Sequence, residues 1–211
     1  MTPDLLTLTQ WLSPAFPVGG FAYSHGLETA IAAGEISDAA SLQIWVGTIL
    51  TEGAGRTDAI LIAHALRPDA DLGTLAAIAR ALAPSRERLA EAEEQGAAFL
   101  RTTNALTGTD FPAMPLPIAI AAAARTLALA PVEVIALTLH AFTSNLVQVG
   151  VRFIPLGQTA GQGVLAALHP LILRIAAEAT TVPLNAIGSG AIRADLAAMQ
   201  HETLDVRIFR T

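Results

Sequence analysis

The spacing of apolar residues is the strongest constraint on the fold of this chain. They recur at helical intervals along almost the whole sequence, and no segment sustains a two-residue alternation long enough for a strand. In the second half, two seams follow this helical spacing: Val132, Ile135, Leu139, Phe142, Leu146 and Val149, and then Leu165, Leu168, Ile172, Ile175 and Ala179. We therefore predict an all-α fold, a single-domain helical bundle of about eight to ten helices over residues 1–211.

Cap and turn residues place some of the helix boundaries. A long helical segment is predicted over residues 38–66, with Asp38 as its N-cap and a kink at Gly53 and Gly55. Another is predicted over residues 84–103, because proline suits the first turn of a helix. The charged side of this second helix is interpreted as a solvated face and not as a binding patch; it carries Arg86, Glu87, Arg88, Glu91, Glu93 and Glu94.

The glycine-rich segment 157–163, with the sequence GQTAGQG, is a weak candidate for a phosphate-binding loop. Its spacing differs from that of a P-loop, and the lysine that such a loop needs is absent. We interpret the segment as a tight turn that leads into a helix, with Thr159 as the predicted cap.

The absence of two residue types excludes several reaction classes. The chain has no cysteine, and all 12 of its basic residues are arginine. Disulfides, thiolate nucleophiles and iron–sulfur clusters are therefore excluded, and so are the familiar lysine-dependent forms of nucleotide and Schiff-base chemistry. A net charge of -6 argues against a nucleic-acid partner.

Two long uncharged runs raise the question of membrane insertion. Residues 134–151 and 153–173 are long enough to cross a bilayer, but they carry several polar residues or prolines, so we predict no membrane association. The first residues lack a basic stretch followed by an apolar core. We therefore expect no export signal and a cytoplasmic protein.

No constellation of catalytic or metal-ligating residues stands out. The five histidines show no spacing that would place two on one helical face, and His140 and His169 are interpreted as core residues. His201-Glu202 is the best ligand candidate, although adjacent helical positions diverge by about 100°. We predict no catalytic residue, no bound metal and no cofactor. A metal-dependent helical hydrolase that uses His201 and Glu202 is the alternative.

Three stretches combine turn residues, aromatic side chains and arginines without forming a recognisable active site. They read SPAFPVGGFAYSHGLE (residues 13–28), PLGQTAGQ (residues 155–162) and HETLDVRIFRT (residues 201–211). In this order and at these separations they resemble the UreF family of urease accessory proteins. The likeness spans essentially the whole chain.

The resemblance implies an all-helical protein without enzymatic activity that takes part in maturation of the nickel enzyme urease. Members of the UreF family bind a UreD/UreH-type scaffold protein and form a two-fold assembly. That assembly recruits and regulates the GTPase UreG and delivers nickel to apo-urease. The expected partners are therefore the scaffold, UreG, apo-urease and a second copy of this chain, with neither nucleic acid nor membrane among them.

The same resemblance assigns partner contacts to both ends of the chain, residues 1–24 and 201–211. Arg207 matches the arginine implicated in GTPase recruitment, and Phe21 and Tyr23 match a conformationally responsive aromatic segment. The other predicted partner-binding residues lie in the last segment: His201, Glu202, Leu204, Phe209 and Arg210. The plainer alternatives are a core-packed turn for the aromatic pair and a frayed end for the last residues.

Overall fold

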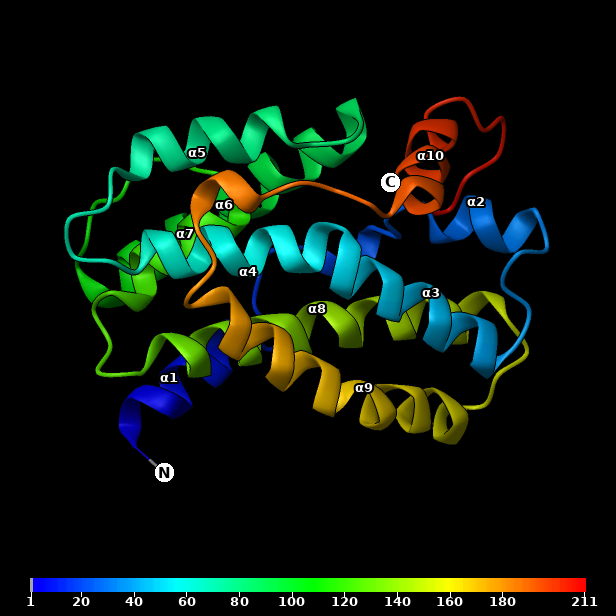
Figure 1. Cartoon of the computed structure of the whole chain (residues 1–211), viewed down its shortest axis with the longest axis horizontal. Coiled ribbons are helices and arrows are strands. Elements are labelled where there is room, and N and C mark those ends of the chain that lie inside the picture. The colour runs from blue at the N-terminus through cyan, green and yellow to red at the C-terminus, as the bar shows by residue number, and fades with distance from the viewer. Residues whose placement is uncertain (1) are drawn as a thin grey trace.

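The computed structural model describes residues 2–211; Met1, the first residue of the predicted domain and of the predicted 1–24 arm, lies outside the described residues. Within residues 2–211 all regular structure is helical (Figure 1). The elements are α1 (Pro3–Trp11), η1 (Gly20–Ala22), α2 (Leu27–Ala32), α3 (Ala39–Glu52), α4 (Ala54–Ala65), α5 (Leu72–Ala81), α6 (Arg86–Thr107), α7 (Leu116–Ala124), α8 (Pro131–Phe153), α9 (Gln158–Ala179), η2 (Leu184–Ala186) and α10 (Ile192–His201). The predicted all-α, single-domain bundle is confirmed.

Helices that are apolar on nearly every side occupy the centre of the bundle. Every residue of α7 from Pro117 to Ala124 is buried, and α7 packs against α4, α5 and α6. Helix α4 is in turn flanked by α3, α8 and α9, and α8 and α9 pack closely against each other. This arrangement follows from the sequence, because a helix without a polar face is stable in water only when it is covered on all sides.

The segment predicted over residues 38–66 is two helices and not one kinked helix. Helix α3 ends and α4 begins at Gly53, whose backbone has the non-helical angles φ -118° and ψ -142°. A Cβ on Gly53 would lie 2.9 Å from the Ala191 side chain, and one on Gly55 would lie 2.8 Å from Leu50 Cα. Because both positions are glycine, α3 and α4 pack closely around this break, where a side chain would clash.

Two other predicted helix starts are close to those observed. Asp38 caps α3, with its carboxylate accepting a hydrogen bond from the Ser41 main-chain N–H at 2.8 Å. The helix predicted over residues 84–103 is α6, which begins after an N-cap at Ser85 and continues for another turn beyond the predicted end. No boundaries were predicted for α5, α7 or α10.

The segment 157–163 leads from a turn into α9 as predicted, but the expected cap is wrong. Gly157 occupies the N-cap position, no side chain caps this end, and Thr159 already lies in the first turn. A Cβ on Gly161 would collide with the Val151 side chain of α8. Glycine at this position therefore serves the close packing of α9 on α8.

Helices α8 and α9 are long and apolar enough to cross a membrane, judged by length and composition alone. In the structure they pack on each other and on α3 and α4, and their buried faces belong to one core. Core helices of soluble proteins pass the same test, so this finding is weak evidence for a membrane span. The absence of membrane association stays a prediction.

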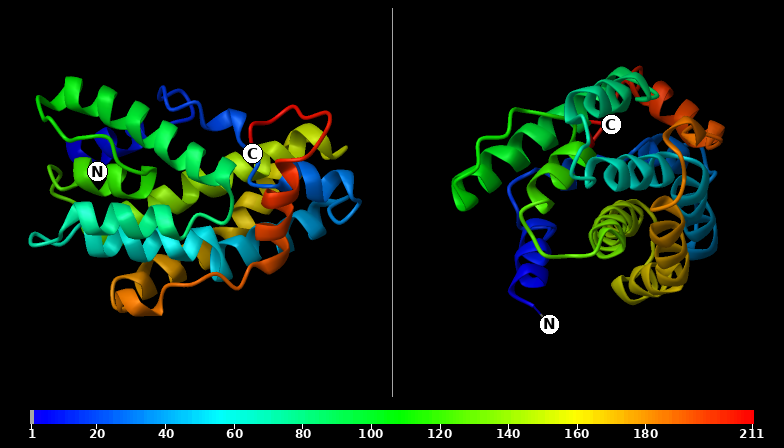
Figure 2. Two further views of the ribbon diagram at one scale, coloured as in Figure 1. Left: turned by 90° about the horizontal axis from the view of Figure 1, so that it is seen from above. Right: turned by 60° about the vertical axis from the view of Figure 1, so that its left-hand side comes forward.

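The chain returns at its end to the segment that leads into α2. Helix α10 packs against α2 and α6, and the residues after it run back past α2 (Figures 1 and 2). Gly26, the N-cap of α2, has a φ of +75°, and a Cβ there would lie 2.5 Å from the main-chain nitrogen of Ala198 in α10. The docking of α10 on α2 thus requires glycine at this position.

We predict that Gly26→Ala destabilises the protein far more than Gly34→Ala. Both glycines have a φ of +75°, so both variants incur about 1–2 kcal/mol from the left-handed backbone. No atom lies within 4 Å of a Cβ at Gly34, whereas the α10 backbone obstructs one at Gly26 and adds about 1–3 kcal/mol. Denaturant unfolding followed by circular dichroism measures both variants. Equal losses of unfolding free energy in the two variants would show that α10 is not held tightly against α2.

Candidate functional site

Residues 202–211, which we call the carboxy-terminal tail, pack against the segment that leads into α2. The Arg210 N–H donates to the Ala22 carbonyl at 2.8 Å, and the Ser24 N–H donates to the Thr211 carbonyl at 2.8 Å. The Ser24 hydroxyl donates to the same Thr211 oxygen. The two segments to which the sequence analysis assigned partner contacts are therefore hydrogen-bonded to each other, and the tail is held in place and not frayed.

Glu28 of α2 anchors the main chain of the tail. Its carboxylate is buried, and its two oxygens accept hydrogen bonds from the N–H groups of Ile208 at 2.9 Å and Phe209 at 3.0 Å. No role was predicted for Glu28 from the sequence, although it is the last residue of the first motif. A buried carboxylate is stable only when donors replace its lost hydration, and here the tail supplies two of them.

His201, the last residue of α10, lies between two carboxylates. It is fully buried, its Nδ1 is 2.7 Å from Glu87 Oε2 of α6, and its Nε2 is 3.2 Å from Glu28 Oε2. The other oxygen of Glu87 pairs with the Arg207 guanidinium. A continuous polar chain therefore joins α2, α10, α6 and the tail.

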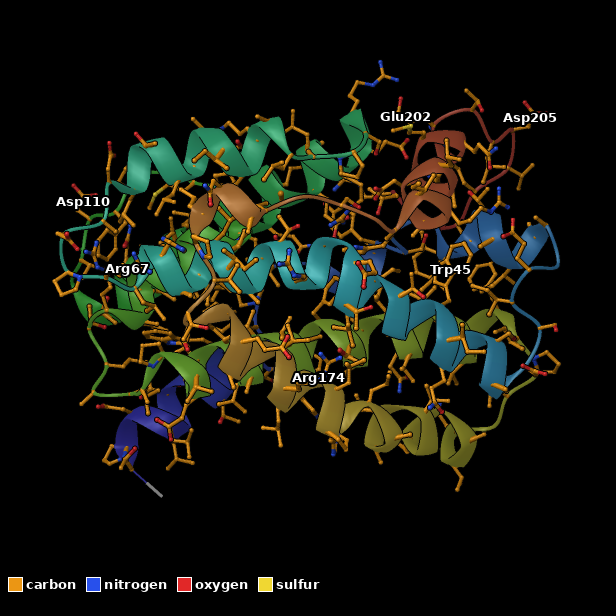
Figure 3. The ribbon with its side chains drawn as sticks, in the orientation of Figure 1. Trp45, Arg67, Asp110, Arg174, Glu202 and Asp205 are labelled. Carbon is orange, nitrogen blue, oxygen red and sulfur yellow. The ribbon has the colours of Figure 1, made fainter. Side chains whose placement is uncertain are left out.

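Glu202 has a different task from its neighbour His201. Its Oε1 accepts hydrogen bonds from the main-chain N–H groups of Arg86 at 2.7 Å and Glu87 at 3.2 Å, and its Oε2 pairs with the Arg86 guanidinium at 3.1 Å. Figure 3 shows Glu202 and Asp205 at the end of the molecule formed by α10 and the tail. Glu202 thus closes the first turn of α6, where free N–H groups and the helix dipole favour a carboxylate.

Tyr23 and Arg210 form a second polar cluster with Glu94 of α6. The Tyr23 hydroxyl donates to Glu94 at 2.9 Å, and Arg210 donates to the Tyr23 oxygen and to Glu94, each at 3.0 Å. The guanidinium also lies 5.4 Å from the centre of the Tyr23 ring. Burial and the neighbouring Glu94 carboxylate raise the pKa of Tyr23 to about 12, so its hydroxyl keeps its proton and acts as a donor.

The predicted partner-binding residues divide by exposure. Phe21, with 63% of its surface exposed, Arg207 and Arg210 reach solvent, Glu202 and Leu204 are half-buried, and Tyr23, His201 and Phe209 are buried. Phe209 packs on Phe153 of α8 with 5.2 Å between ring centres. Val206 and Ile208 are not among the predicted site residues, yet they are the most exposed large apolar side chains of the tail, at 84% and 75%.

The interpretation of the charged side of α6 as a solvated face is wrong for Glu91, and Glu87 and Arg88 are also mostly covered, with 17% and 12% of their side-chain surface exposed. The Glu91 carboxylate is buried and pairs with Arg88 and His25, while Gln95 and the Thr211 hydroxyl donate to it at 3.0 and 2.9 Å. Burial opposes its ionisation, but Arg88 and His25 together hold the pKa of Glu91 well below its usual value. Burial, reinforced by Arg88, lowers the pKa of His25.

A cavity of about 280 Å³ adjoins this cluster, between α4, α6 and α8. Its wall is mainly apolar, with Leu61, Phe99 and Phe142 among the lining side chains and Asp58, Arg88 and Gln95 among the polar ones. Burial raises the pKa of Asp58 from 3.8 to about 7. Neither the cavity nor a role for Asp58 was predicted from the sequence, because a single aspartate in an apolar helix carries no local signal of its surroundings.

We predict that Asp58→Asn stabilises the protein at pH 8. Because the pKa of Asp58 is higher in the folded state than in the unfolded chain, stability falls as the pH rises from 3.8 toward 7. Asp58→Asn lacks this ionisation, so its free energy of unfolding at pH 8 should exceed that of the native protein by about 1–3 kcal/mol. The difference should vanish near pH 4. Thermal unfolding at both pH values tests this, with the exposed Asp69→Asn as control. Destabilisation by Asp58→Asn at both pH values would contradict it.

The fold and these contacts define a class of protein: a helical bundle whose buried charged groups hold its own carboxy-terminal tail against the core. Comparison with known proteins identifies the family within that class. A model of the UreF family matches residues 36–169. The chain also contains, outside that range, the two terminal motifs quoted above.

Full-length relatives agree with the family model. The chain is 64% identical over 211 residues to "Urease accessory protein UreF" of Cereibacter sphaeroides strain KD131, covering 100% of both chains. It is 63% identical to the protein of that name from strain ATCC 17023, again over 100% of both chains, and 54% identical over 206 residues to that of Dinoroseobacter shibae, over 98% of each. The chain belongs to the UreF family of urease accessory proteins.

Proposed function

We propose that this protein is a cytoplasmic maturation factor for urease that acts by binding and has no catalytic activity. It binds a UreD/UreH-type scaffold, pairs with a second copy of itself in that complex, and recruits and regulates the GTPase UreG, so that nickel reaches apo-urease. The observation that carries the proposal is the docked tail, whose family motif is held from inside by buried residues while Arg207, Val206 and Ile208 face outward.

The exposed side chains are suited to protein contact. Val206, Ile208 and Phe21 expose most of their surface, and large apolar side chains without cover gain free energy when a partner buries them. Arginine is enriched at the energetic centres of interfaces, and Arg207 is accessible although it is paired with Glu87. These features support a binding role for the tail.

The alternative, a metal-dependent hydrolase that uses His201 and Glu202, has little support. Both ring nitrogens of His201 face carboxylates, and Glu202 is engaged by the first N–H groups of α6. Among residues 2–211, no group of three or more potential ligand residues is arranged to hold a metal ion. A hydrolytic metal would have to displace the contacts that fix the tail.

Regulation of the GTPase does not require an arginine finger in this proposal. Arg207 is held by Glu87 at the surface, so its first task in a complex is to recognise an acidic or hydrogen-bonding group of the partner. When this binding orders the switch segments of the GTPase, the population of its catalytically competent conformation changes, and its rate of GTP hydrolysis changes with it.

Replacement of Arg207 by alanine tests the proposal. We expect Arg207→Ala to retain helical content and scaffold binding, because its side chain is partly exposed, but to weaken UreG capture by about tenfold or more and to reduce urease activation. Arg174→Ala on α9 is the matched control: Arg174 is also an exposed arginine in an ion pair, and it lies far from the tail (Figure 3). Unchanged UreG capture, or unfolding of the variant, would refute the assigned role of Arg207.

The oligomeric state provides a second test. We expect the isolated chain to dimerise or aggregate, because its exposed apolar residues lack cover, and to form a defined complex when the UreD/UreH-type scaffold is added. Size-exclusion chromatography with light scattering distinguishes these states. A monomer that binds neither the scaffold, nor UreG, nor apo-urease would contradict the proposed function.

A further inference from the structure

Each ring nitrogen of His201 faces a carboxylate. Its Nδ1 lies 2.7 Å from Glu87 Oε2, its Nε2 lies 3.2 Å from Glu28 Oε2, and the ring has no exposed surface. Ionised carboxylates only accept hydrogen bonds, and an imidazole nitrogen donates only when it carries a proton. Both contacts therefore exist together as hydrogen bonds only when His201 is a doubly protonated imidazolium.

The two carboxylates that His201 joins are the ones that hold three consecutive residues of the tail. Glu87 pairs with the Arg207 side chain, and Glu28 accepts the N–H groups of Ile208 and Phe209. Arg207 is therefore fixed from two directions, by its guanidinium and by the main chain that follows it. His201 is the residue that links these two attachments.

The charges around His201 explain why its cation matters. Glu28 of α2 and Glu87 of α6 face it directly, and Arg207 of the tail neutralises Glu87 only from the partly exposed side. The nearby charges of Glu202 and Arg86 pair with each other at the start of α6. Without a cation between them, Glu28 and Glu87 would be left as two poorly solvated like charges.

We propose that His201 is a positioning residue: as a buried imidazolium it ties Glu28 to Glu87 and thereby fixes the tail with Arg207 directed outward for the GTPase. Because His201 has no exposed surface, its role in this proposal is to place the tail, whereas the sequence-based prediction for it is direct partner contact. The placement of the tail by His201 is a property of the chain alone, whereas its effect on GTPase capture rests on the proposed function of Arg207.

The first test uses the native protein and needs no variant. In ¹⁵N spectra of histidine side chains at pH 7, we expect both ring nitrogens of His201 to carry protons. His64, whose Nε2 contacts the Val182 carbonyl at 2.9 Å and no carboxylate, serves as the internal comparison. A ring of His201 with one unprotonated nitrogen would overturn the proposal.

The second test is His201→Gln, compared with Arg193→Ala on the same helix, where Arg193 pairs with Glu35 at the surface away from the tail. In His201→Gln we expect hydrogen-exchange protection of the Ile208 and Phe209 amides to fall by about tenfold or more, while the helices of the core stay folded. Arg193→Ala should leave that protection intact. Unchanged protection in His201→Gln would overturn the proposal.

A compensating variant separates charge from packing. In His201→Gln/Glu87→Gln one of the two like charges is gone, so Glu28 should again hold the amides of Ile208 and Phe209, and their protection should return toward the native level. UreG capture should stay weak, because Arg207 has lost its carboxylate. Protection that stays lost in the double variant would show that His201 acts only by filling space.

Capture of UreG by the scaffold-bound His201→Gln variant separates two parts of the proposal: the placement of the tail by His201 and the recruitment of the GTPase by Arg207. Capture weakened by about tenfold, as expected for Arg207→Ala, supports positioning of Arg207 by His201. Loss of amide protection with unchanged capture would uphold the placement of the tail by His201 and overturn the proposed role of Arg207 in GTPase recruitment.

Discussion

The burial of carboxylates among apolar helices is the constraint on which the docked tail depends. Glu28 and Glu91 are both buried, and each has lost the water that an exposed carboxylate would bind. The tail supplies part of the replacement in both cases: two main-chain N–H groups to Glu28, and the Thr211 hydroxyl to Glu91. The tail and the interior therefore stabilise each other, because a buried carboxylate without its donors is costly.

The residues in and around the tail therefore fall into two groups: those that attach the tail to the interior, and those that face solvent. Phe209 points inward and packs on Phe153, while its neighbour Ile208 is exposed, and the alternation lets one short segment do both. Tyr23 belongs to the first group, since its buried hydroxyl bridges Glu94 and Arg210. In the proposed binding role, a segment attached from inside in this way presents its outward side chains with little loss of entropy on binding.

Sequence motifs marked the two segments that the structure brings together, but not the contacts that their residues make. The motif that ends at Glu28 and the motif that begins at His201 both mark the observed site, yet Glu28 and Phe209 are 181 positions apart, and nothing local indicates that they meet. For the same reason Glu91 was assigned to a solvated face: a charged residue on a helix is usually exposed, and its burial depends on which elements cover it. The neighbours His201 and Glu202 were considered together as ligands, whereas they are hydrogen-bonded to different groups.

The sequence by itself determined the helical class, the single domain and the family. Helical periodicity and motif order are properties of neighbouring or colinear residues, and no tertiary information is needed to recognise them. Only the tertiary structure decided that the helix over residues 38–66 breaks fully at Gly53, that Asp58 lies beside a cavity, and that Glu28 and Glu87 share His201. Each of these depends on the packing of elements distant in the chain, because burial and charge pairing arise from contacts in space.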